Sequence, residues 1–147
     1  MRAFIAEYSV AHDPLLAPEG AAMLTVIRDS FERCGYEVVH PGHGDFLAGI
    51  RRLAPACEVG LVIAPDHLLF AFTSALEQLT HNIGCGSMNA AICANKRQSA
   101  EILARNGIAV PEEGGGGLRV VKPEQGCAAK GVRLTRESPG PGEFAQR

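Results

Sequence analysis

The sequence predicts an α/β fold in which a parallel sheet with flanking helices precedes a smaller α+β unit. Strand-like apolar runs and helical patterns alternate three times and enter a fourth strand, as in parallel sheets with right-handed crossovers. Residues 59–64, VGLVIA, form a continuous apolar run, which is typical of a central strand covered on both faces. After Gly86 the pattern changes to short helices, a glycine run and short strands.

In the first half, local signals set the expected bounds of the elements. Pro18 suits the first turn of a helix that Gly35 ends. Asp45 and Asp66 each precede a helical pattern and can cap it, since aspartate side chains accept hydrogen bonds from the first free backbone amides. We therefore expect strands at residues 3–8, 36–40, 59–64 and 82–84, with helices over 18–34, 46–53 and 67–79.

Polar residues follow these strands at the edge where parallel sheets bind ligands. They are Glu7, Tyr8, His40, Asp66 and His67. His40 and His43 also suggest metal ligation, but a Pro/Gly turn does not fix their geometry, so we favour a polar turn. For Asp66 we favour a helix cap over a substrate contact.

The second half begins with two predicted helices, from Ser87 to Ala94 and from Lys96 to Asn106, the latter capped by Asn95. Gly107 and Pro111 end the second helix, and a glycine run follows. Short strands are expected at residues 118–121 and 131–134, with a further strand starting at Glu143.

Composition excludes several classes of protein. A chain of 147 residues suits one domain, or one domain and part of another. It has no apolar run near the ~20 residues of a membrane span and no signal-peptide pattern, so we expect a cytoplasmic protein with no membrane partner. Five cysteines without a C-x-x-C pair argue against a disulfide framework and a zinc ribbon. A net charge of −2 gives no support to nucleic-acid binding.

The charge is uneven, however. Residues 118–147 carry six Lys/Arg and three Asp/Glu, a net +3, whereas residues 1–117 carry eight and thirteen, a net −5. Lys122 ends a strand before a loop from Gly126 to Gly131, and a cation beside a flexible loop suits a phosphate. The loop is not a Walker A motif, because Val132-Arg133 replaces Lys-Ser/Thr. Solvated surface charges remain the alternative.

Lys96 is the second candidate. It falls in the first turn of a helix, where the helix dipole disfavours a cation by some tenths of a kcal/mol. A bound anion would remove this conflict, although an exposed lysine can tolerate the cost. Cys127 lies in the loop, where packing of a small residue is favoured over a reactive thiol. No catalytic residue can be assigned.

Two runs, GCGSMNAAICANKRQSAEILARNGIAVP and RVVKPEQGCAAKGVRL, resemble ATP-grasp ligases, and the preceding half resembles their Rossmann-like preATP-grasp domain. The runs EGAAML, GYEVV and APDHLLFAFTSALE are most similar to archaeal ATP-grasp proteins related to tyramine–glutamate ligase of methanofuran biosynthesis. The resemblance implies domains at 1–86 and 87–147, the second being a partial ATP-binding subdomain.

The resemblance also implies a site and a reaction. Lys96 and Lys122 would bind ATP phosphates, and Val121 would lie near the adenine. The loop over the β- and γ-phosphates would comprise Gly126, Cys127, Ala128, Ala129, Lys130 and Gly131. In this family a carboxylate is activated as an acyl phosphate, which an amine then attacks, with magnesium neutralising charge. ATP and a small carboxylate and amine are thus the implied partners.

The loop departs from the family pattern, because Cys127, Ala128 and Ala129 stand where more glycine is usual. The resemblance covers only the first half of such an enzyme, so we expect the magnesium ligands outside residues 1–147. We therefore expect no ligation by this chain alone, and a homodimer or a complementing C-terminal half as partner. The alternatives are a non-catalytic nucleotide- or partner-binding module and, last, a flavodoxin-like regulatory domain using Glu7, Asp13 and Asp66.

Overall fold

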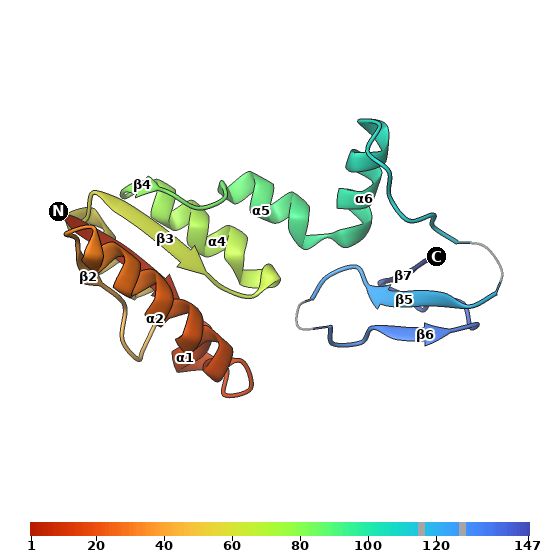
Figure 1. Ribbon diagram of the computed structural model, residues 1–147, viewed down its shortest axis with the longest axis horizontal. Coiled ribbons are helices and arrows are strands. Elements are labelled where there is room, and N and C mark those ends of the chain that lie inside the picture. The colour runs from red at the N-terminus through yellow and green to blue at the C-terminus, as the bar shows by residue number, and fades with distance from the viewer. Residues whose placement is uncertain (115–116, 127–128) are drawn as a thin grey trace. The chain divides into compact units, whose positions relative to one another are not determined.

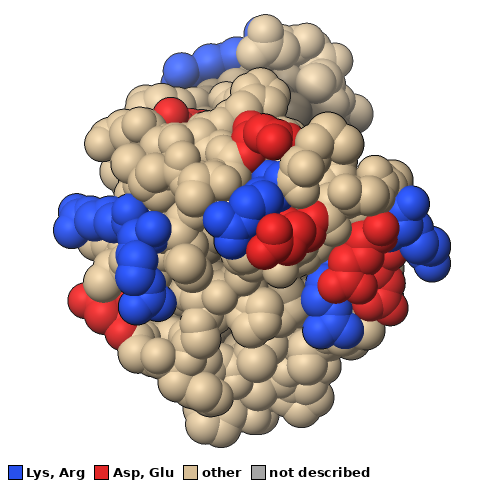
Figure 2. Space-filling model, turned by 90° about the vertical axis from the view of Figure 1, so that its left-hand side faces the viewer, with Lys and Arg blue, Asp and Glu red and all other residues tan. Residues whose placement is uncertain are grey.

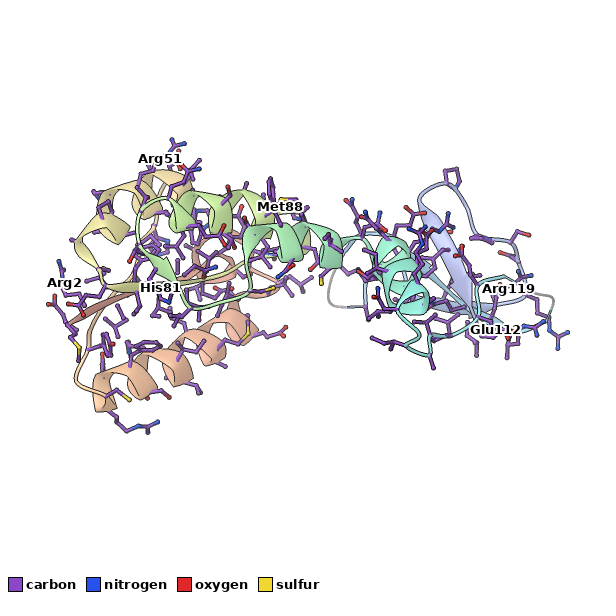
Figure 3. The ribbon with its side chains drawn as sticks, turned by 90° about the horizontal axis from the view of Figure 1, so that it is seen from above. Arg2, Arg51, His81, Met88, Glu112 and Arg119 are labelled. Atoms are coloured by element: carbon purple, nitrogen blue, oxygen red, sulfur yellow. The ribbon has the colours of Figure 1, made fainter. Side chains whose placement is uncertain are left out.

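The computed structural model describes residues 1–114, 117–126 and 129–147. The chain divides into two compact units, Met1–Ala90 and Ala91–Arg147 (Figure 1). The division falls within helix α5 (Ser87–Ala94), just beyond the boundary expected after Gly86. In α5, Ser87 and Ala90 are buried, whereas the side chain of Met88 is exposed (Figure 3).

The first unit is built on a four-stranded parallel sheet in the order β2-β1-β3-β4. This confirms the predicted parallel α/β arrangement, with the VGLVI run as a central strand. Its elements in chain order are β1 (Arg2–Glu7), α1 (Ser9–His12), α2 (Ala17–Arg33), β2 (Glu37–Val39), α3 (Phe46–Leu53), the 3₁₀ turn η1 (Ala54–Ala56), β3 (Val59–Ile63), α4 (Asp66–Glu77) and β4 (His81–Asn82).

The core of this unit lies between the central strands and the helices. Phe4, Ile50 and Leu76 are fully buried, and each such side chain contributes about 1.5–3 kcal/mol through the hydrophobic effect. Gly60 of β3 admits α4 at close range, because a Cβ there would lie 2.7 Å from Cδ1 of Leu76. The strand therefore needs glycine at this position for the helix to pack.

Helix starts follow the predicted caps in α3 but not in α4. The Asp45 carboxylate accepts a 2.9 Å hydrogen bond from the backbone N–H of Ala48, as expected. The cap predicted at Asp66 is wrong: Pro65 is the N-cap, and its carbonyl accepts the N–H of Leu68 at 2.9 Å. Pro65 has the extended backbone of an N-cap residue, so the helix proper begins at Asp66. Helix α1 was not predicted, since four residues are too few to show a helical period.

The second unit combines helix α6 with a small antiparallel sheet in the order β6-β5-β7. Asn95 caps α6 as predicted, accepting the N–H of Gln98 at 2.9 Å. Val121 and Phe144 are buried in its core. The strand expected from Gly131 begins later, because Gly131 still belongs to a turn, with a φ of +75°. The elements are α6 (Lys96–Arg105), β5 (Arg119–Pro123), β6 (Arg133–Thr135) and β7 (Glu143–Gln146).

The surface carries its charges in mixed pairs. On the face in Figure 2, acidic and basic side chains lie interspersed among uncharged residues. Exposed ion pairs of this kind join Arg2 to Glu37 at 3.3 Å and Arg28 to Glu32 at 3.7 Å. Each contributes about 0–1 kcal/mol. In the described part of the chain, no helix is long and apolar enough to cross a membrane.

Candidate functional site: a lysine-lined cavity in the second unit

A cavity of about 150 Å³ lies between the start of α6 and the segment that follows β5. Three of its lining residues are lysines, and none of the described residues that line it is acidic. Like charges gathered at one cavity raise the local positive potential and so favour an anionic ligand. The lining residues include Lys96, Lys122, Gln125, Gly126, Ala129 and Lys130.

Lys96 reaches this cavity because α6 begins at it. Asn95 caps the helix, and the backbone N–H of Lys96 donates a 2.8 Å hydrogen bond to the carbonyl of Glu124. The ammonium of Lys96 donates to the carbonyl of Gly126. Backbone and side chain of one residue thus tie the helix start to the segment after β5, and they hold the ammonium at the edge of the cavity.

Lys122 comes from β5 and lies opposite Phe144 of β7 in the strand pairing. Its ammonium lies 5.0 Å from the centroid of the Phe144 ring. A cation over an aromatic face gains about 0.5–1 kcal/mol at exposed sites, and more where water is excluded. Phe144 is buried, so the ring gives the lysine a fixed support beside the cavity.

Val121, which is predicted to lie near the adenine, is a core residue of the second unit. It is fully buried, and successive side chains of a strand point to opposite faces, so it lies on the face opposite Lys122. Val120 shares the face of Lys122 and is 37% exposed. The side chains of Val120 and Lys122 thus share one face of β5, and that of Val121 lies on the other.

The loop predicted to cover phosphates is described in part. Cys127 and Ala128 lie outside the described residues. In the part of the loop that follows them, the backbone N–H of Val132 donates a 3.2 Å hydrogen bond to the carbonyl of Ala129, whose φ is +53°. Gly131 also has a positive φ, and a Cβ there would lie 2.9 Å from Cγ of Pro123. The loop thus returns against the end of β5 through a tight turn.

Arg97, which sequence reasoning missed, anchors α6 to the sheet. Its guanidinium lies 3.0 Å from the carboxylate of Glu113 and 3.3 Å from that of Glu124. It also donates to the carbonyl of Glu143 at 3.3 Å and lies 5.7 Å from the Phe144 ring centroid. These partners come from distant parts of the sequence, so no local pattern could have identified the residue.

A second charged pair braces the sheet on its other face. Arg133 of β6 and Glu143 of β7 form two hydrogen bonds, at 2.5 and 2.7 Å, across β5. Together with the N–H of Gly140, at 2.8 Å, the guanidinium lowers the pKa of Glu143 to about 2. The carboxylate in turn raises the pKa of Arg133. Strand alternation places this pair away from Lys122, so its charges do not neutralise the cavity.

Three other residues singled out from the sequence, Glu7, His40 and His43, line a cavity in the first unit. Asp13 accepts the N–H of Leu15 at 3.0 Å, as a local turn cap. Among residues 1–114, 117–126 and 129–147, no group of three His, Cys, Asp or Glu side chains could hold a metal ion.

Comparison with known proteins identifies the fold. No protein-family model matches the sequence, and no curated protein sequence matches it. Among solved structures, an ATP-grasp superfamily protein from Archaeoglobus fulgidus is similar over 99% of this chain and 52% of its own, with a TM-score of 0.82 and 21% identity. D-Alanine–D-alanine ligase from Bacillus anthracis matches over 94% and 50%, with a TM-score of 0.70 and 19% identity.

N5-carboxyaminoimidazole ribonucleotide synthetase from Thermotoga maritima matches over 99% of this chain and 46% of its own, with a TM-score of 0.68 and 15% identity. The chain thus spans about half the length of these solved structures. The resemblance to ATP-grasp proteins that the two sequence runs suggest is confirmed at the level of fold. Over nearly all of its residues, this chain therefore has the α/β fold that makes up about half of an ATP-grasp superfamily protein.

Proposed function

We propose that this chain supplies the phosphate-binding lysines of an ATP-dependent carboxylate–amine ligase of the ATP-grasp type. The observation that carries the proposal is the meeting of Lys96, from the start of α6, with Lys122, from β5, at one cavity. Their sequence contexts, NK and VVKP, are those that resemble the family. The solved structures with this fold include a D-alanine–D-alanine ligase complexed with ATP and a synthetase complexed with ADP.

In this proposal the two lysines neutralise the phosphates of ATP and hold them in place. Three cations at one small cavity suit a polyphosphate, because each charged contact made away from water contributes about 1.5–3 kcal/mol. Lys130 and the segment from Gly126 to Gly131 would close over the β- and γ-phosphates. Enzymes that transfer phosphoryl groups act largely by positioning the reacting groups and by stabilising charge. The lysines are suited to both roles.

The overall reaction would join a carboxylate to an amine, with the carboxylate first activated as an acyl phosphate. Mg²⁺ would supply further neutralisation of the phosphates, and no described residue cluster is assigned to hold it. By sequence resemblance, glutamate and tyramine are the first acid and amine to test. We further propose that the protein works in the cytoplasm, as a homodimer or with a complementing half.

Two measurements test the proposal. Isothermal titration calorimetry with ATP and with ADP should show nucleotide binding, which added inorganic phosphate or pyrophosphate weakens by competition. ADP release should then be measured with glutamate plus tyramine, using the longest natural form of the protein. Nucleotide binding without ADP release across a panel of acids and amines would favour the non-catalytic binding module. Absence of nucleotide binding would overturn the proposed site.

A further inference from the structure

Helix α2 covers one side of the sheet in the first unit and exposes its opposite face. It packs against β1, β2 and α1 (Figure 1). Because a helix has 3.6 residues per turn, positions 19, 22, 26 and 33 fall on one line along it. All four residues are exposed, whereas the buried Gly20 lies on the side of the core. We call this line of Glu19, Ala22, Val26 and Arg33 the outer stripe.

The outer stripe combines an apolar centre with charged ends. Val26 has 66% of its surface exposed, and Met23, which lies beside the stripe one turn earlier, has 37%. Ala22 is small enough to allow a second helix to approach closely. Glu19 lies in the first turn and Arg33 in the last, each seven residues, or about two turns, from Val26. The opposite charges are therefore placed symmetrically about the apolar centre.

This symmetry makes the stripe complementary to itself. When two copies of a helix pair about a two-fold axis, residues equally far from the axis on opposite sides face each other. With the axis at Val26, this valine meets its own counterpart, and Glu19 of each copy meets Arg33 of the other. In a parallel pair, like charges would face each other at both ends. The charges thus favour an antiparallel pair of α2 helices.

Hydrogen bonds along the helix hold Arg33 on the exposed face. Its Nη2 donates to Oγ of Ser30 at 3.2 Å, and this hydroxyl donates to the carbonyl of Val26 at 2.8 Å. The guanidinium has further N–H groups for a carboxylate. Beside the stripe, Arg28 lies 3.5 Å from Asp29, so these two charges balance each other within the helix.

The two ends of α2 also carry a projecting side chain and a matching hollow. Leu15, in the turn before the helix, is 69% exposed. At the other end lies a hollow of about 170 Å³, which Ser30, Phe31, Cys34 and Tyr36 line. An antiparallel pair brings the start of each helix to the end of the other, so each Leu15 comes to the hollow of the other copy. Transfer of this side chain from water into the hollow would favour association.

We propose that the outer stripe of α2 binds the same stripe of a second copy of this chain, in an antiparallel pair centred on Val26. The charge pairs and the end contacts both suit this occupant. A contact built on one helix is small, so association should be weak, with a Kd in the micromolar range or above. The proposal gives a surface to the homodimer named above. It uses the first unit alone and would stand if nucleotide binding failed.

Sedimentation equilibrium of the 147-residue protein, over a wide range of concentration, measures the Kd of the dimer. Val26→Glu should raise this Kd about tenfold or more, because two carboxylates would meet at the axis. Thr25→Glu is the matched control: the residue is exposed but turned about 100° from Val26, so the Kd should stay that of the wild type. Leu15→Ala should raise the Kd severalfold, and Leu103→Ala, at an exposed leucine of α6, should not.

Charge reversal tests the antiparallel register. Glu19→Arg and Arg33→Glu should each raise the Kd severalfold, because like charges would then face each other at both ends of the pair. The double variant, Glu19→Arg with Arg33→Glu, should recover the affinity of the wild type, since opposite charges face each other again. The reversed charges oppose the helix dipole, so thermal melts followed by circular dichroism check that each variant is folded.

The results that would contradict the proposal are distinct from one another. A monomer at every concentration would assign the stripe to a different chain or to solvent. A dimer that no α2 variant weakens would place the interface on another face. Equal weakening by Val26→Glu and Thr25→Glu would show a general effect of charge, and failure of the double variant to recover affinity would exclude the antiparallel pair. If Val26→Glu does not fold, the charge-reversal series decides alone.

Discussion

The backbone N–H of Lys96 donates a 2.8 Å hydrogen bond to the carbonyl oxygen of Glu124. The first residue of a helix is thereby fixed to the residue after a strand that lies far away in the sequence. One amide that the helix itself leaves without a partner is satisfied in this way. The lysine ammonium reaches the same segment at Gly126, so the position of the charge depends on the sheet as well as on the helix.

Removal of either cavity lysine should weaken ATP binding. In Lys96→Ala and Lys122→Ala, we expect Kd for ATP to rise about tenfold to a hundredfold, since each loses a charged contact worth ~1.5–3 kcal/mol. Arg105→Ala is the control, because this residue lies on the same helix with a side chain 76% exposed. Calorimetry measures all three. Wild-type affinity in both lysine variants would remove the site assignment.

Replacement of Arg97 by lysine should impair nucleotide binding although the charge is kept. The guanidinium contacts Glu113 and Glu124 together, and a lysine cannot reproduce this planar, forked geometry. Because these ion pairs are partly exposed, we expect a loss of stability of only ~1 kcal/mol. We expect a severalfold rise in Kd for ATP, with Arg105→Lys as the matched control. A thermal melt and calorimetry on the same samples separate the two effects.

Gly131→Ala should destabilise the second unit. Its φ of +75° strains any residue with a Cβ, and that Cβ would lie 2.9 Å from Cγ of Pro123. We expect a loss of about 1–3 kcal/mol, measured by urea unfolding. Gly42→Ala is the control, since its Cβ would meet nothing within 4 Å, and it should change stability by ~0.5 kcal/mol or less. Equal effects would show that the turn has no preference for glycine.

The Arg133–Glu143 pair should make the small sheet sensitive to acid. The folded state lowers the pKa of Glu143 from 4.5 to about 2. The carboxylate therefore stabilises the fold above pH 4.5, and this contribution is lost as the pH falls toward 2. In Glu143→Gln, unfolding should depend less on pH across this interval. NMR titration of Glu143 gives the pKa itself, and a midpoint near 4.5 would contradict the prediction.

Local signals in the sequence predicted most of the elements. The VGLVIA run indicated a central strand because both of its faces are apolar, and Asp45 and Asn95 indicated helix starts because capping involves neighbouring residues. Asp66 failed as a cap because the preceding proline already had the backbone that begins a helix. Helix α1 was missed because a single turn has no period to detect.

The candidate site was predictable only in part, because local signals do not show which distant segments meet. Lys96 and Lys122 were identifiable from their contexts, but Arg97 was not, since its three acceptors come from separate segments. Val120 shares a face of β5 with Lys122 by strand alternation, and the pairing of β5 with its neighbours places Arg133 and Glu143 on the other face. A shift of one residue in a strand reverses the face, and sequence patterns rarely fix strand bounds so closely.

From the sequence alone, most helices and strands, the starts of two helices and the two lysines of the candidate site could be predicted. These depend on periodicity and capping, which act over a few neighbouring residues. The folded chain was needed to show that Lys96 and Lys122 line one cavity, that Arg97 anchors α6 to the sheet, and that Gly20 leaves space for the Glu7 carboxylate. Such relationships depend on close packing between distant segments, and the space around a side chain is defined only when the chain has folded.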